Sequence, residues 1–232
     1  MKKKIAIIPA RGGSKGILDK NIVMINGKPL IEWSIKNALD SNSIDSVWVT
    51  SDSEKILDIS QSCGADIIMR PKEISGDKSS SELAWIDAIN QIRKKSNFEI
   101  DIVIGMQATS PIREASDLDQ AIEEFYSKNL DSLFSANLID DFNYWSTDSS
   151  GNYQSVNYDY KNRRMRQDNE TKILENGSFY IFRPDGIIHS KNRLHGKICP
   201  FLMDKHKSFQ IDEIEDLQIC EAIMRRFIDS GS

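Results

Sequence analysis

Short, continuous apolar runs alternate along the chain with longer stretches in which apolar residues recur every three or four positions. A continuous run is typical of a strand buried on both faces, whereas the wider spacing is typical of a helix with one buried face. Strands are predicted at Ile5–Ile8, Val47–Thr50, Ile67–Met69, Ile100–Met106, Ser132–Ser135 and Gly177–Phe182. Helices are predicted over Leu30–Leu39, after Ser51–Ser53, from Ser79–Ser81, from Asp117 and around Leu217–Phe227. This alternation predicts an α/β fold: a mostly parallel, Rossmann-like sheet with helices on both faces.

The pattern breaks after Ala136. The stretch Asp140–Met165 has no helical period and is rich in Tyr, Asn, Ser and Asp, with Trp145 among its aromatic residues. So many aromatic side chains favour an ordered excursion or an oligomer contact over a floppy loop.

Composition narrows the class of protein. Lys plus Arg is 30 and Asp plus Glu is 35, so the net charge is 30 − 35 = −5, which disfavours nucleic acid as a partner. The three cysteines are far apart in sequence, which excludes a disulfide framework and argues against a structural zinc site. The first apolar run ends at Ala10, too early for a signal peptide, and no later run is long enough to span a membrane. We therefore expect a soluble cytoplasmic protein.

A glycine-rich loop, Arg11–Gly16, follows the first predicted strand, and Lys20 and Asn21 lie just beyond it. Ligands of such sheets bind outside the carboxyl ends of the strands, and glycines let backbone N–H groups approach an anion closely. The loop has neither the Gly-Lys-Ser/Thr ending of a P-loop nor the glycine spacing of a dinucleotide fingerprint. Taken alone, it indicates either a triphosphate site or an ordinary β–α turn with solvated lysines.

A second polar segment, Gln107–Pro111, follows the strongest predicted strand. Its position at a strand end places it at the ligand edge of the sheet. The alternative is that Thr109, Ser110 and Pro111 simply turn the chain.

The loop together with Lys20 and Asn21 closely resembles the opening of the CMP-sialic acid synthetases, the acylneuraminate cytidylyltransferases. The resemblance continues through five further blocks in family order: Met69–Pro71, Gly76–Ser81, Gln107–Arg113, Asn176-Gly177 and Ile211-Asp212. Together these blocks cover nearly the whole chain and are far more specific than the loop alone.

The resemblance implies one cytidylyltransferase domain over residues 1–232, which joins CTP to an acidic nine-carbon (nonulosonic) sugar with Mg²⁺ and releases pyrophosphate. It implies that the nucleotide contacts Arg11, Gly12, Ser14, Lys15, Lys20, Asn21, Arg70 and Ser81. It implies that the sugar contacts Gln107, Ser110, Arg113, Arg166 and Gln167. The catalytic set would be Arg11, Lys15, Lys20 and Asp212, with Asp212 as the ligand of Mg²⁺.

Residues 137–172 would then form a dimerisation excursion that carries a sugar clamp. Arg166 and Gln167 match an arginine–glutamine pair of the family, and Arg binds carboxylates through two hydrogen bonds. The basic run Lys161–Gln167 could instead contact RNA, but it is short and the chain is acidic.

The sequence departs from the family at Gln210, where related synthetases often have a second aspartate. On a strand Gln210 and Asp212 would face the same side, so the metal would gain no second charge there. An alternative role for Asp212 is a helix N-cap, because Glu215 follows it at capping-box spacing.

Two other functions stay open on the sequence: a cytidylyltransferase for an eight-carbon acid such as Kdo, and a non-catalytic nucleotide-binding module suggested by Gln210. The histidines His189, His195 and His206 are scattered, and we assign none of them a catalytic role.

Overall fold

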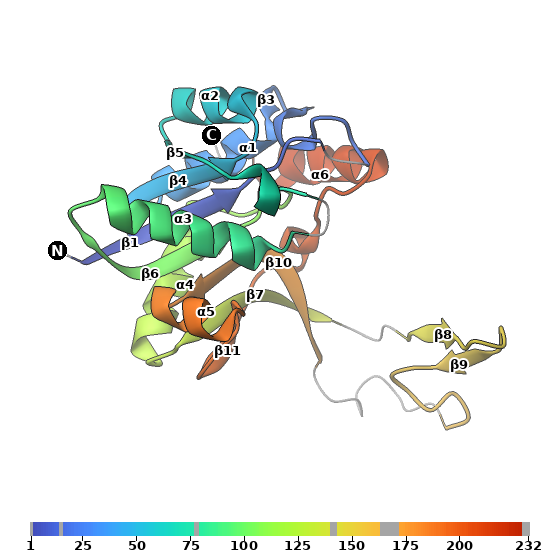
Figure 1. The fold of residues 1–232 in the computed structure, drawn as a ribbon. Coiled ribbons are helices and arrows are strands. Elements are labelled where there is room, and N and C mark those ends of the chain that lie inside the picture. The colour runs from blue at the N-terminus through green and yellow to red at the C-terminus, as the bar shows by residue number, and fades with distance from the viewer. Residues whose placement is uncertain (1, 14–15, 77–78, 140–142, 163–171, 229–232) are drawn as a thin grey trace.

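A seven-stranded sheet forms the centre of the protein in the computed structural model, which describes residues 2–13, 16–76, 79–139, 143–162 and 172–228 (Figure 1). The strands lie in the order β11 (Ile198–Leu202), β7 (Ser132–Ile139), β10 (Lys172–Phe182), β6 (Glu99–Met106), β1 (Lys2–Pro9), β4 (Ser46–Ser51) and β5 (Asp66–Met69). Strand β10 is antiparallel to both neighbours and the other pairs are parallel, which confirms the predicted mostly parallel sheet.

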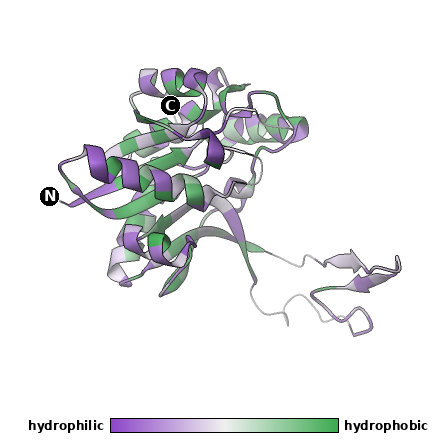
Figure 2. Cartoon of the chain, in the orientation of Figure 1, coloured by the Kyte–Doolittle hydropathy of each residue, from purple (hydrophilic) through white to green (hydrophobic). Residues whose placement is uncertain are grey.

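Helices cover both faces of this sheet. One face packs against α1 (Leu30–Leu39), α2 (Glu54–Ser62) and α4 (Ala115–Ser127), and the other against α3 (Ser81–Lys95) and α5 (Pro184–Ser190). The last helix, α6 (Ile214–Phe227), packs on a third cluster with the start of α1. The helices alternate between hydrophobic and hydrophilic colours in Figure 2, as expected when one side of each is buried.

Strand β1 shows why its apolar run is continuous. Ala6 and Ile8 belong to the core on the α1 face, whereas Ile5 and Ile7 belong to the core on the α3 face. Because successive side chains of a strand point to opposite faces, a strand covered on both sides needs an apolar residue at every position.

Several short elements are not among those predicted from the sequence. They are α5, β11, the hairpins β2–β3 (Met24–Ile25, Lys28–Pro29) and β8–β9 (Trp145–Thr147, Tyr153–Ser155), and the 3-10 turns at Lys20–Ile22, Lys72–Ile74 and Lys205–Ser208. Strand β11 contains Pro200, which is tolerated because β11 pairs only with β7 at the edge of the sheet. None of the helices in the described ranges is both long and apolar enough to cross a membrane.

The start of α6 corrects two expectations. The residues before it, 209–213, form no strand, so the alternation expected for Gln210 and Asp212 does not apply. The N-cap is Glu213, and the capping box joins Glu213 to Asp216 rather than Asp212 to Glu215. Asp212 is therefore not the N-cap, and its carboxylate is available for another role.

Strand β10 is interrupted by an irregularity between Glu175 and Tyr180, where its register to β7 shifts. Gly177 lies there in the left-handed region, with φ of +66°, which glycine adopts at no steric cost. Beyond this point β7 and β10 extend away from the body toward the β8–β9 hairpin, and we call residues 137–172 the arm (Figure 1).

Candidate active site

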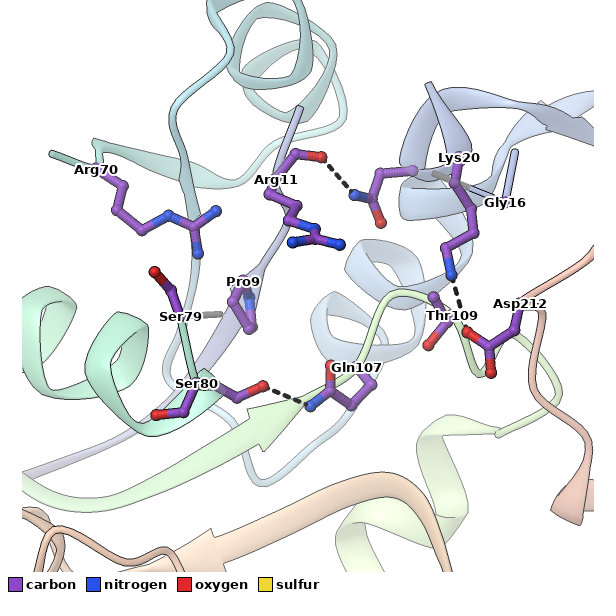
Figure 3. Close-up of a pocket in the computed structure, with 12 residues that line it drawn as sticks. Pro9, Arg11, Gly16, Lys20, Arg70, Ser79, Ser80, Gln107, Thr109 and Asp212 are labelled. Atoms are coloured by element: carbon purple, nitrogen blue, oxygen red, sulfur yellow. Dashed lines mark hydrogen bonds and ion pairs between the residues drawn. The ribbon is translucent and has the colours of Figure 1, made fainter. Parts of the chain in front are cut away.

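A cavity of about 420 Å³ lies at the carboxyl ends of β1, β5 and β6 and at the start of α3 (Figure 3). Its described lining residues are Pro9, Arg11, Gly16, Lys20, Asn21, Arg70, Ser79, Ser80, Ser81, Gln107, Thr109 and Asp212. This is the edge at which α/β sheets bind ligands. The cavity is bordered by both segments at which the sequence predicts a site, the loop after the first strand and the segment after Met106.

Lys20 and Asp212 form an ion pair in the cavity. Lys20 Nζ lies 2.9 Å from Asp212 Oδ1, and Figure 3 shows the lysine reaching toward the aspartate. The Lys20 side chain is 15% exposed and that of Asp212 is 71% exposed. The aspartate therefore keeps most of its carboxylate accessible to a ligand while the lysine is held against the protein.

Arg70 supplies a second cation from the end of β5. Its Nε donates to Ser75 Oγ at 3.1 Å, and Nη2 lies 3.6 Å from Asp52 Oδ1. Nη2 is buried and makes no hydrogen bond with any described residue. Burial lowers the pKa of Arg70, and the neighbouring Asp52 carboxylate opposes that shift. A buried donor of this kind at a cavity wall is suited to an acceptor atom of a ligand.

Two side chains outside the glycine loop, those of Asp52 and Asn21, form hydrogen bonds with its main chain. The Gly12 N–H donates to Asp52 Oδ1 at 2.9 Å, and Asn21 Nδ2 donates to the Arg11 carbonyl at 2.9 Å. Asp52 thus contacts both the loop and Arg70. From the sequence, Ser51–Ser53 is expected only to precede a helix. The position of Asp52 after a strand end is the signal that could have placed it at the site.

Gln107 is anchored on the opposite side of the cavity. Its Nε2 donates to Ser81 Oγ at 3.2 Å, and its backbone N–H donates to the Ser178 carbonyl at 3.0 Å. Its own carbonyl accepts a hydrogen bond from Arg113 Nη2 at 2.7 Å. Gln107 is therefore fixed through three groups at the end of β6.

Arg113 and Ser110 do not reach the cavity, which differs from the sugar contacts expected of them. Arg113 is 1% exposed, and its guanidinium donates to Gln107, to the carbonyl and hydroxyl of Ser178, and to Ser34 Oγ. Burial lowers the pKa of Arg113 to about 9, which still leaves the guanidinium charged at neutral pH. Arg113 ties the loop after β6 to α1 and β10, so it supports the site without lining it.

The structure brings seven of the fourteen expected site residues together. Those that line the cavity are Arg11, Lys20, Asn21, Arg70, Ser81, Gln107 and Asp212. Gly12 lies beside it, with its N–H bound to Asp52. Ser14, Lys15, Arg166 and Gln167 lie outside the described residues. The cavity is also lined by residues that are not predicted from the sequence: Pro9, Gly16, Ser79, Ser80 and Thr109.

The described lining is strongly cationic. Arg11, Lys20 and Arg70 face one carboxylate, Asp212. Within the described ranges, no group of three or more His, Cys, Asp or Glu side chains is arranged to hold a metal ion. Such a lining can bind a polyanion through its cations and can share a hard cation between Asp212 and the oxygens of that ligand.

Solved structures share the fold. The CMP:2-keto-3-deoxy-manno-octonic acid synthetase complexed with CTP superposes with a TM-score of 0.71 at 17% identity, covering 97% of this chain and 99% of that one. A 4-diphosphocytidyl-2C-methyl-D-erythritol synthase superposes with a TM-score of 0.69 at 12% identity, covering 97% of this chain and 100% of that one. At these identities the likeness concerns the fold.

Curated relatives are more similar in sequence. N-acylneuraminate cytidylyltransferase A of Danio rerio is 36% identical over 96% of this chain and 51% of its own length. Pseudaminic acid cytidylyltransferase of Campylobacter jejuni is 32% identical over 96% of this chain and 97% of its own length. The chain thus spans about half the length of the N-acylneuraminate relatives and nearly all of the pseudaminic acid relative. A family model described as cytidylyltransferase matches residues 5–223, and the chain belongs to this family.

Proposed function

We propose that the protein transfers CMP from CTP to an acidic nonulosonic sugar. The anomeric C2 hydroxyl oxygen would form a bond to the α-phosphorus while the bond from that phosphorus to the bridging oxygen breaks. Pyrophosphate leaves with the bonding electron pair, and the hydroxyl proton is released. The observation that carries the proposal is the Lys20–Asp212 pair at 2.9 Å in a cavity lined by two further cations, Arg11 and Arg70.

The residues would act mainly by position and charge. Phosphoryl-type transfer needs little covalent chemistry from a protein, so orientation and charge stabilisation dominate. Lys20 and Arg11 would stabilise the charge of the phosphates, and Arg70 would offer its unbonded Nη2 to an acceptor of the nucleotide. Lys15, which like Arg11 belongs to the glycine-rich loop, is predicted to contact the phosphates as well.

Asp212 would hold a divalent cation, which we propose to be Mg²⁺. Mg²⁺ prefers carboxylate, phosphate and water oxygens, and Asp212 offers an exposed carboxylate at the cavity. When bound, the cation supplies charge compensation for the triphosphate. Lys20 would then turn from Asp212 toward phosphate oxygens, because both groups would have a new partner of opposite charge.

Gln107 would contact the acceptor sugar from the carboxyl end of β6, and Arg166 and Gln167 are the predicted clamp for its carboxylate. A nine-carbon acid is favoured because the relatives named for N-acylneuraminate and pseudaminic acid are 28–36% identical to the chain. The structural neighbour named for an eight-carbon acid is 17% identical.

The test is a pyrophosphate-release assay with CTP and Mg²⁺ over neuraminic, legionaminic and pseudaminic acids and Kdo, with products identified by mass. We expect a CMP adduct of a nine-carbon acid. Turnover of Kdo alone would assign the chain to the eight-carbon class. Tight CTP binding with no turnover of any acid would indicate a nucleotide-binding module.

We also propose that the chain is one domain over residues 1–232 and that it forms a homodimer through the arm. Trp145 and Tyr160 have ring centroids 5.3 Å apart, and Trp145 Nε1 donates to the Tyr158 hydroxyl at 2.9 Å, so the hairpin and the residues after it share an aromatic cluster. Tyr153 nevertheless leaves 77% of its surface exposed. Exposed aromatic residues are typical of protein interfaces. Light scattering of the whole chain should give twice the monomer mass, and removal of the β8–β9 hairpin should give a monomer.

A further inference from the structure

The segment that carries Asp212 is held by a separate contact at each of three consecutive residues. Gln210 Nε2 donates to the carbonyl of Asn176 in β10. The N–H of Ile211 donates to the Thr109 carbonyl at 2.8 Å. The carbonyl of Asp212 lies so close to Gly16 that a Cβ there would come within 2.5 Å of it. The main chain of residues 210–212 is therefore fixed between β10, the loop after β6 and the glycine loop.

Gln210 faces β10 and is not among the described residues that line the cavity. Its amide packs directly on Gly177, where a Cβ would overlap Gln210 Nε2. The left-handed glycine at the irregularity of β10 therefore makes room for this side chain. An amide is suited to the place, because it donates to a main-chain carbonyl, whereas an ionised carboxylate has no proton to donate.

The acceptor of that hydrogen bond is itself rigid. Asn176 is 3% exposed, and its Oδ1 accepts from Ser135 Oγ at 2.6 Å. Its Nδ2 donates to Asn137 Oδ1 at 2.7 Å. A buried polar network whose members are bonded to one another holds its backbone in one conformation. Gln210 is thus tied to a fixed point of the sheet.

We propose that Gln210 is a positioning residue: it sets the Asp212 carboxylate at the cavity through the main chain and does not itself contact the cation or the substrates. The role rests on the proposed function in that Asp212 is the cation ligand. Loss of the Gln210 amide frees residues 210–212 from β10, so the Ile211–Thr109 hydrogen bond opens more often. The Asp212 carboxylate then occupies a wider range of positions at the cavity.

Two variants and one control test this role. Gln210→Met removes the donor at similar size, and Gln210→Glu keeps the shape and adds a charge. Gln218→Met, on the exposed side of α6, is the control. The first readout is hydrogen exchange of the Ile211 amide in the metal-free protein, and the second is the Mg²⁺ concentration for half-maximal pyrophosphate release.

Both Gln210 variants are expected to exchange the Ile211 amide about fivefold faster and to need about fivefold more Mg²⁺, as loss of one neutral hydrogen bond implies. The control should change neither value. Unchanged exchange in both variants would overturn the proposal. So would a lower Mg²⁺ requirement in Gln210→Glu, because it would make position 210 a direct contact of the cation. The exchange experiment needs no turnover, so it tests the role of Gln210 even if the wild-type protein transfers CMP to none of the acids.

Discussion

Lys20 and Asp212 are 192 positions apart in sequence, yet Lys20 Nζ lies 2.9 Å from Asp212 Oδ1. The lysine follows the glycine loop after β1 and the aspartate precedes α6, so the pair joins the first and last parts of the fold at the cavity. Because Asp212 is largely exposed, the pair is held more by its surroundings than by its own attraction, which solvent screens.

Lys20→Met is expected to lower kcat for pyrophosphate release by roughly 100- to 1,000-fold, the usual effect of removing one transition-state charge contact. The melting temperature should barely change, since an exposed ion pair contributes about 0–1 kcal/mol. Lys55→Met is the matched control, because Lys55 pairs with Asp19 at 3.1 Å on an exposed surface. Near-normal turnover by Lys20→Met would remove Lys20 from the mechanism.

Arg113→Met is expected to lower the free energy of unfolding by about 3 kcal/mol, because buried acceptors on Ser34, Ser178 and Gln107 lose their donor. Urea titration measures the loss. The control is Lys94→Met on an exposed part of α3, which should change stability by less than about 0.5 kcal/mol. A loss below about 1 kcal/mol in Arg113→Met would show that the buried network is not required.

Alanine substitution of two glycines with positive φ can distinguish the cost of backbone strain from the cost of side-chain overlap. Gly151 has φ of +84° and open space around its Cα, whereas Gly177 has φ of +66° and packs on Gln210. Gly151→Ala should cost about 1 kcal/mol or less, from conformation alone. Gly177→Ala should cost about 3 kcal/mol, since overpacking adds to the strain. Equal losses in thermal or urea unfolding would argue against close packing at Gly177.

Asp216 is expected to make the stability of the fold depend on pH, so that stability is lost at low pH. Backbone N–H groups of Glu213 and Asp212 donate to its carboxylate and lower its pKa. A carboxyl group whose pKa is lower in the folded protein stabilises the fold above its unfolded pKa, near 4, and loses that contribution as the pH falls through the folded value. The melting temperature of Asp216→Ala should therefore lie below that of the wild type at pH 7, and the gap should narrow below pH 4. A gap that stays constant down to pH 3 would contradict this account.

The sheet was readable from sequence because a parallel strand buried on both faces needs apolar residues at successive positions, as in Ile5–Ile8. Helix α1 was predicted with its observed bounds, Leu30–Leu39, for a related reason: its apolar spacing is regular and Pro29 precedes it. Hydrophobic patterns within a single strand or helix are therefore sufficient to predict these elements.

The errors at Arg113 and Gln210 concern contacts between distant segments. An arginine in a polar motif suggested a substrate contact, but Arg113 is buried because Ser34 and Ser178 converge on it from other elements. The capping box starts at Glu213 instead of Asp212, a shift of one residue that pattern alone does not resolve. The bond from Gln210 to Asn176 depends on the irregularity of β10, which follows from tertiary packing.

The direction of β10 has a wider consequence. Since β6 and β7 are both antiparallel to β10, they point the same way, and the carboxyl end of β7 and the amino end of β10 reach the sheet edge that holds the cavity. The arm thus begins and ends on the cavity side of the sheet. Changes in its length or sequence can alter that side during evolution, while the pairing of β1 with β4 and β6 stays as it is.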